Sequence, residues 1–131
     1  MNPRRVPTRR AQRAEAFTRR RIAEKYLEVA ELAATEDGIA NNVAIGLAVL
    51  AGIAAGDANC IAAVRERYSG KDHLAAAHFL QRIDKVSGDE LLTLIELKSV
   101  SHYGFEVLGD RQRTRAMRAA RSLVLAARRR T

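Results

Sequence analysis

The chain has 131 residues, of which 47% are hydrophobic but only 5% aromatic, and it contains no tryptophan. This length corresponds to one domain, whose core must be built from alanine, leucine, isoleucine and valine. The single cysteine, Cys60, excludes an intramolecular disulfide framework, and no CxxC pair offers a cysteine-based zinc site. We expect a cytoplasmic protein, because polar and charged residues follow the basic N-terminus where a signal peptide needs an apolar segment.

Positive charge is concentrated at the two ends of the sequence. The net charge is +8 and the sequence pI is about 10.5. Residues 1–22 contain eight Arg and one Glu, a net +7, and residues 110–131 contain eight Arg and one Asp, again +7, so the middle carries −6. If the ends lie side by side, they form one cationic surface that attracts phosphate backbones. The alternative is that these arginines form solvated helix faces and tails.

The arginines expected to contact nucleic acid come from both of these ends. They are Arg9, Arg10, Arg13, Arg20, Arg111, Arg115 and Arg118. Aromatic residues are not interleaved with them, so phosphate contacts are expected rather than base stacking.

Two long helices are predicted in the first half of the chain. The first covers about Thr8–Ala34, with apolar residues recurring every three to five positions, and Gly38 closes it. The second covers about Asn42–Tyr68 and is apolar on nearly every side. Such a helix is either a core helix or a membrane span. Because its uninterrupted run of 13 apolar residues is shorter than the roughly 20 that a bilayer needs, we expect a core helix.

Three further helices are predicted. They cover about Lys71–Val86 and Asp89–Tyr103, the latter opened by a capping box of Ser87 and Glu90, and a last segment that begins near Asp110 as N-cap. The sequence therefore predicts an all-α, four- to five-helix up-and-down bundle. Residues 1–16 are expected to form an Arg-rich N-terminal extension, and residues 17–131 the single helical-bundle domain.

Two features of the second helix stand out. Gly52 and Gly56 are four residues apart, which favours a seam of small residues where another helix approaches closely. Asp57 follows directly, and an ionised carboxylate in such an apolar helix needs a partner. We expect Asp57 and Asp72 to be structural polar residues, with His73 or a helix N-terminus as the partner of Asp57 and Lys98 also available. A catalytic role for Asp57 is the alternative.

Three short segments carry a resemblance to a known family. They are AVLAGIAAGDA at 48–58, GKDH at 70–73 and LKSVSHYG at 97–104. In their order and in the number of helices, over about residues 18–128, they resemble the HEPN superfamily, most closely a small bacterial branch of it. The resemblance implies a helical bundle, often a homodimer. It also implies a link to RNA cleavage or to toxin–antitoxin and defence modules with a nucleotidyltransferase partner.

The signature of that family is an Arg followed by a His four to six residues later. Arg67 and His73 have this spacing, whereas Lys98 and His102 lie where the motif normally falls but with Lys in place of Arg. In RNA cleavage by the ribose 2′-hydroxyl, the His would transfer a proton and the cation would stabilise charge on phosphorus. The resemblance thus makes His102, Lys98, His73 and Arg67 the candidate catalytic residues, with no metal and no cofactor.

These observations favour a nucleic-acid-associated protein or a toxin–antitoxin or defence component that binds RNA or DNA phosphates through its Arg-rich terminal helices. Two alternatives belong to other classes. One is a metal-independent ribonuclease, and the other is a non-catalytic homodimeric module that binds a separate protein, such as a nucleotidyltransferase antitoxin. No membrane partner is expected.

Overall fold

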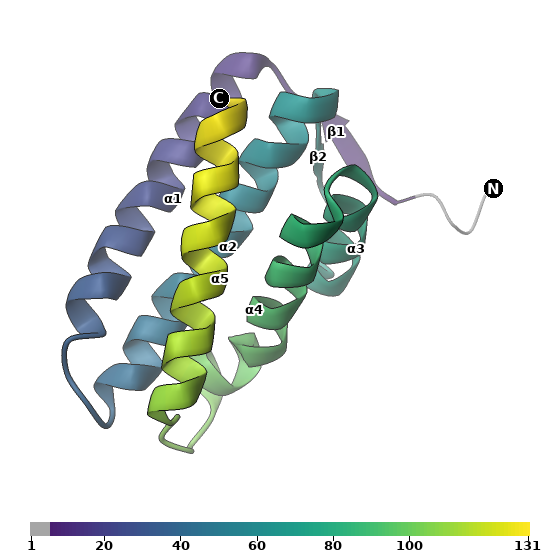
Figure 1. Cartoon of the computed structure of the whole chain (residues 1–131). Helices are drawn as coiled ribbons and strands as arrows, with labels where there is room; N and C mark the ends of the chain where they lie inside the picture. The colour runs from purple at the N-terminus through teal and green to yellow at the C-terminus, as the bar shows by residue number, and fades with distance from the viewer. Residues whose placement is uncertain (1–5) are drawn as a thin grey trace.

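The computed structural model describes residues 6–131 as an all-α helical bundle, which confirms the predicted fold class. It contains five helices and one short two-stranded ribbon (Figure 1). The elements in chain order are β1 (Thr8–Arg10), α1 (Arg13–Ala33), α2 (Ala40–Val64), β2 (Glu66–Tyr68), α3 (His73–Ile83), α4 (Lys85–Tyr103) and α5 (Asp110–Arg130).

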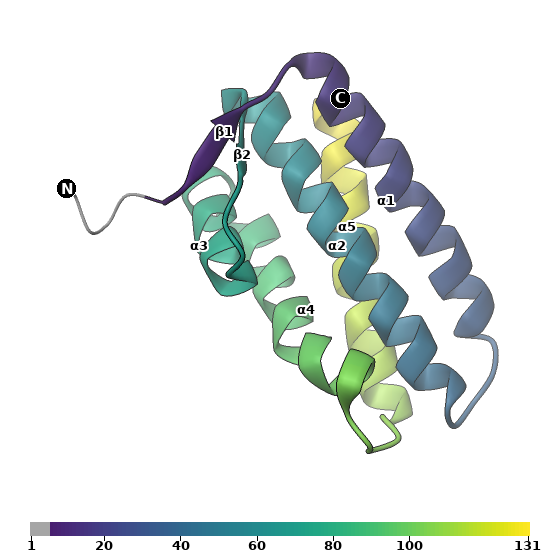
Figure 2. The same cartoon turned by 180° about the vertical axis from the view of Figure 1, so that it is seen from behind.

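The long helix α2 lies at the centre of the bundle. Helices α1 and α4 flank it on opposite sides, and α5 covers its front face (Figure 1). Seen from behind, no element crosses in front of the middle of α2 (Figure 2). Within residues 6–131, α2 is the one helix long and apolar enough to cross a membrane, and 61% of its apolar window is buried in the bundle. This burial fits the predicted core helix.

Small residues on α2 allow the neighbouring helices to approach closely. A side chain at Gly52 would lie 2.3 Å from Leu94 Cδ1 on α4 and 3.3 Å from Leu123 Cδ1 on α5. One at Gly56 would lie 3.2 Å from Leu91 Cδ2. The predicted seam of small residues is therefore confirmed, and α4 and α5 are the helices that use it.

The first and second predicted helices are wrong at one end each. Residues 8–10 and 66–68 form β1 and β2, which pair antiparallel with Arg9 opposite Arg67. The backbone N–H of Ala11 donates to the carbonyl of Arg65 at 2.9 Å, and that of Ser69 donates to Pro7 at 3.0 Å. Arg65 ends α2 with a left-handed backbone, φ 58°. This conformation turns the chain out of the helix, and pairing with a strand 58 positions away then replaces helical hydrogen bonds.

The predicted capping box at Ser87 is also wrong. Asp84 is the residue that ends α3 and begins α4, since its carboxylate accepts from the Ser87 N–H at 3.2 Å. This hydrogen bond lowers the pKa of Asp84. Ser87 and Gly88 are consequently buried within α4, where a side chain at Gly88 would lie 2.5 Å from the backbone of Gln81. The two helices meet too closely at this point for any other residue.

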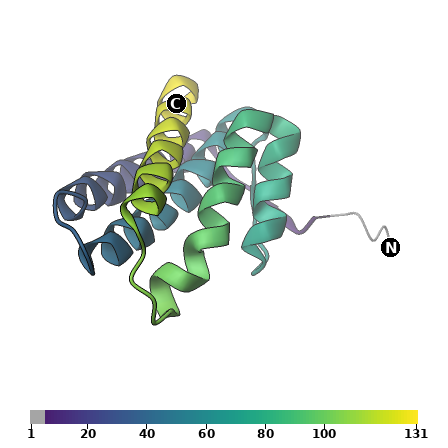
Figure 3. The same ribbon diagram turned by 60° about the horizontal axis from the view of Figure 1, so that its bottom comes forward.

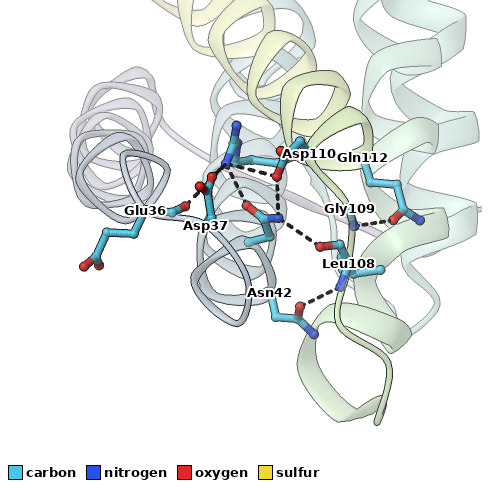
Figure 4. Close-up of polar contacts among 9 residues, drawn as sticks. Glu36, Asp37, Asn42, Leu108, Gly109, Asp110 and Gln112 are labelled. Atoms are coloured by element: carbon cyan, nitrogen blue, oxygen red, sulfur yellow. Dashed lines mark hydrogen bonds and ion pairs between the residues drawn. The ribbon is translucent and has the colours of Figure 1, made fainter.

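Polar contacts hold together the α1–α2 loop and the α4–α5 loop, which lie at the lower end of the bundle (Figures 3 and 4). The buried Asn41 donates to the carbonyl of Leu108 and to Asp110 Oδ1, both at 2.9 Å, and accepts from Arg113 at 2.8 Å. Asn42 accepts from the N–H of Leu108 at 2.9 Å. The last helix begins at Asp110 as predicted, but its N-cap is Gly109 rather than Asp110.

Candidate functional site around Asp57 and the arginine faces

Asp57 is paired with Arg19, and this differs from the predicted partners. Arg19 on α1 donates to Asp57 Oδ2 at 3.1 Å, and both side chains are partly exposed. The carboxylate therefore ties α2 to α1 instead of to α3. Arg19 could not be predicted as the partner, because the contact spans 38 positions and depends on how α1 and α2 are aligned. Asp72, expected to be a structural polar residue, caps α3 by accepting from the Leu74 N–H at 3.0 Å.

Burial raises the pKa of Asp57, although the charge of Arg19 and then that of Arg67 oppose the shift. Burial of this carboxylate therefore outweighs the attraction of the two arginines.

An open pocket of about 550 Å³ lies over the Arg19–Asp57 pair. Its lining consists of Ala14, Glu15, Thr18 and Arg19 from α1, Asp57 and Ile61 from α2, and Arg67 from β2. The ribbon of β1 and β2 holds Arg67 in this position. Two guanidinium groups and two carboxylates therefore share one volume large enough for a small ligand.

His73 lies on the other side of Asp57, at a nearly closed cavity of about 20 Å³ that Cys60 and Tyr68 also line. Within residues 6–131, no group bonds the buried Nδ1 of His73. Burial lowers the pKa of His73, and the charge of Lys98 lowers it further. Burial also raises the pKa of Cys60 to about 12, so this thiol stays protonated and unreactive near neutral pH.

The two candidate catalytic pairs have different surroundings. Arg67 and His73 line cavities on either side of Asp57, and Lys98 acts electrostatically on His73. The Nε2 of His102, in contrast, lies 3.2 Å from the carbonyl of Gly46. Gly46 and Asp57 are 11 residues apart on α2, a separation of about 16 Å along the helix axis. His102 is therefore not part of the Asp57 site.

Half of the arginines on α5 hold the bundle together. Arg121 and Arg128 pair with Glu31 and Glu24 of α1 at 2.8 and 2.5 Å. Arg113 pairs with Asp37 at 3.5 Å, and Arg130 pairs with Asp84 at 3.5 Å. These contacts show that α1 and α5 run antiparallel, and they account for part of the terminal charge.

The remaining arginines of α5 face solvent. Arg111, Arg115 and Arg118 are exposed and form no ion pair with residues 6–131, and with Thr114 they line a shallow groove of about 350 Å³. Their spacing of four and three residues places them about 6 and 4.5 Å apart along the helix. Arg129, near the end of α5, is also exposed and forms no ion pair with residues 6–131. Arg111, Arg115 and Arg118, all predicted to contact nucleic acid, thus form one continuous face.

The arginines of the N-terminal end lie elsewhere. Arg9 and Arg10 are exposed on β1, and Arg13 is exposed at the start of α1, whereas Arg20 is bound to Glu24 at 2.8 Å and to Thr131 at 3.0 Å. The start of α1 is next to the end of α5, so it lies at the opposite end of α5 from Arg111 (Figure 1). Arg4 and Arg5 lie outside the described residues. The described arginines therefore form two separate basic regions.

Comparison with known proteins assigns no family. No protein-family model matches the chain, and no curated protein matches it significantly. The function must therefore be argued from the residues themselves.

The raised pKa of Asp57 predicts the effect of Asp57→Asn on stability. A carboxyl whose pKa is higher in the folded than in the unfolded chain destabilises the fold as pH rises through the folded value, and this cost is absent below the unfolded value near 4. We expect Asp57→Asn to raise the midpoint of thermal unfolding at pH 7 by about 2 °C or more, a fraction of a kcal/mol. Melting curves between pH 4 and 8 should show this gain shrinking at low pH. A lower midpoint at pH 7 would mean that the pair with Arg19 outweighs burial.

Proposed function

We propose that this protein binds nucleic-acid phosphate backbones through the outer face of α5. The observation that carries the proposal is the division of the arginines on that helix. Arg113, Arg121, Arg128 and Arg130 contact acidic groups of the bundle, while Arg111, Arg115 and Arg118 extend into solvent. Three unpaired guanidinium groups in a row attract polyanions and release counterions when they contact phosphates. The exposed Arg10 and Arg13 supply a second contact region on the same chain.

This surface matches phosphate contact better than base readout. Its groove is shallow and lined by arginine, threonine and one aspartate, with no aromatic side chain. Such a surface holds the backbone without reading the sequence. Together with the resemblance to HEPN proteins, it supports a role as a nucleic-acid-associated component of a cytoplasmic toxin–antitoxin or defence module.

The test is a gel-shift titration of RNA and duplex DNA at several salt concentrations. Each phosphate contact contributes about 0.7–0.9 to the slope of log affinity against log salt. Replacing Arg111, Arg115 and Arg118 together by Gln should therefore weaken binding at low salt by at least tenfold and reduce the slope by about 2. The matched control is Arg82→Gln, which removes an exposed arginine on α3. Equal affinities and slopes for the triple variant and the control would exclude the α5 face.

A second candidate function is metal-independent RNA cleavage at the Asp57 site. The observation in its favour is the buried Nδ1 of His73, which has no partner within residues 6–131. A histidine with a lowered pKa is neutral near pH 7 and is able to accept a proton. Arg67, which lines the pocket on the far side of Asp57, is the candidate cation of this pair.

Incubation of labelled RNA with the protein in EDTA tests this function. Cleavage should be lost in His73→Ala and retained in His102→Ala, because His102 is bound to the carbonyl of Gly46. The opposite pattern would place the active residues at Lys98 and His102, and intact RNA in every sample would leave phosphate binding as the function.

The resemblance also implies a homodimer, and we propose that the uncovered side of α2 forms its interface. Val43 on this helix is 52% exposed, and Ile39 just before it is 74% exposed. Sedimentation equilibrium at micromolar concentration should give twice the chain mass of 14.5 kDa, and Val43→Asp should shift it toward one chain. A wild-type monomer would contradict the proposal. The resemblance also implies a separate protein partner, such as a nucleotidyltransferase antitoxin, and we propose this partner on that ground alone.

A further inference from the structure

We infer that the pocket between the N-terminal ribbon, α1 and α2 binds a nucleoside monophosphate group, with Arg9 and Arg67 holding its phosphate. The group is either a free mononucleotide or the 5′-phosphorylated end of an RNA strand. This pocket is separate from the outer face of α5. The inference goes beyond backbone binding, and its test is able to fail while the α5 face still binds nucleic acid.

The first argument is the register of the ribbon. Arg9 lies directly opposite Arg67, and opposed residues of an antiparallel pair share one face with Cβ atoms about 4.5–5.5 Å apart. Like charges in this position repel each other and destabilise the pair. Neither arginine forms an ion pair with residues 6–131, and the one side-chain hydrogen bond of Arg67 goes to the neighbouring carbonyl of Tyr68 at 3.4 Å. An anion between the two guanidinium groups removes this repulsion.

The neighbouring positions of the ribbon emphasise the contrast. Arg10 lies opposite Glu66, an opposite-charge pair, and the hydroxyl of Thr8 donates to the same Glu66 at 2.7 Å. The other face of the ribbon is thus matched in charge. The face with Arg9 and Arg67 is left with two positive charges.

The second argument is the pocket that Arg67 lines. Its volume of about 550 Å³ lies within the range of small-molecule sites. Arg19 neutralises Asp57 through Oδ2, and Glu15 accepts from the Gln12 N–H at 2.6 Å as part of the helix cap. The two arginines and two carboxylates of the lining balance in charge, and Arg9, opposite Arg67 on the ribbon, adds one positive charge beside them. Asp57 Oδ1 accepts no hydrogen bond from residues 6–131, so it is available to a ribose hydroxyl or a base amino group.

The charge on the ligand favours a phosphomonoester over a backbone diester. A monoester carries between one and two negative charges at pH 7 because its second pKa is about 6, whereas a diester carries one. Two guanidinium groups at opposed positions of the ribbon complement the monoester, and guanidinium–phosphate contacts are frequently bidentate. A pair of arginines at the edge of a pocket therefore suits a terminal phosphate, while the open row on α5 suits a chain of diesters.

Calorimetric titration of the full chain with AMP and GMP tests the inference, with adenosine, ribose 5-phosphate and inorganic phosphate as comparisons. We expect both nucleotides to bind at one site, and adenosine and inorganic phosphate to bind at least tenfold more weakly. Arg67→Gln and Arg9→Gln should each weaken nucleotide binding at least tenfold. Ribose 5-phosphate should bind between these limits, since it retains the phosphate and the hydroxyls.

Thermal melting without ligand gives an independent reading of the arginine pair. Because Arg9→Gln removes a like-charge repulsion, this variant should melt at or above the wild-type temperature. Arg67→Gln also removes the attraction between Arg67 and Asp57, so a single cooperative melting transition is the check that it is folded. The triple α5 variant with Gln at positions 111, 115 and 118 is the matched control. It should bind AMP as the wild type does, even though its binding to RNA in the gel shift is weakened at least tenfold.

Four results would overturn the inference. They are no nucleotide binding at millimolar concentration, equal binding of AMP and adenosine, equal binding of AMP and inorganic phosphate, and unchanged affinity in both arginine variants. Competition between AMP and short RNAs with a 5′-phosphate or a 5′-hydroxyl distinguishes the two sources. Stronger competition by the 5′-phosphorylated RNA assigns the strand end, and equal competition assigns the free nucleotide.

Discussion

Close packing against α2 is the constraint on which the bundle depends. Nine of the 15 buried residues of this helix are alanine or glycine, so that neighbouring helices reach it at short distance. Leu94 of α4 occupies the space that a side chain at Gly52 would need. A core of this kind contains few aromatic rings and obtains its cohesion from many small contacts at high density. The neighbouring helices leave one side of α2 uncovered, and Asp57 lies on that side.

The acidic middle and the basic ends of the chain have a structural purpose that their net charge does not reveal. Glu24 and Glu31 on α1 and Asp84 between α3 and α4 pair with arginines of α5, so part of the positive charge at the C-terminal end fixes the last helix in place. Partly exposed pairs of this kind each contribute little to stability, but several of them fix the direction and register of α5. Phosphate binding is proposed for three of the arginines left unpaired within residues 6–131, Arg111, Arg115 and Arg118.

The sequence was sufficient for the elements whose cause is local. The apolar run of α2, the Gly52–Gly56 seam and the start of α5 all follow from the residues within each segment. What could not be predicted depends on partners far along the chain. Three-residue strands have no pattern of their own, and β1 exists because residues 66–68 lie beside it. The Arg19–Asp57 pair and the polar cluster of Asn41 depend in the same way on the alignment of whole helices. The capping box at Ser87 failed for a different reason, since Asp84 offered a better cap one turn earlier.

The central position of α2 has a consequence for synthesis of the protein on the ribosome. This apolar helix is made second, yet α3, α4 and α5, which all pack against it, are made after it. Until α5 leaves the ribosome, the side of α2 that α5 covers has no native partner. Because exposed apolar surface promotes aggregation, the nascent chain passes through a vulnerable stage that ends only with its last helix. Truncation within α5 should therefore be tolerated far less well than its surface position suggests.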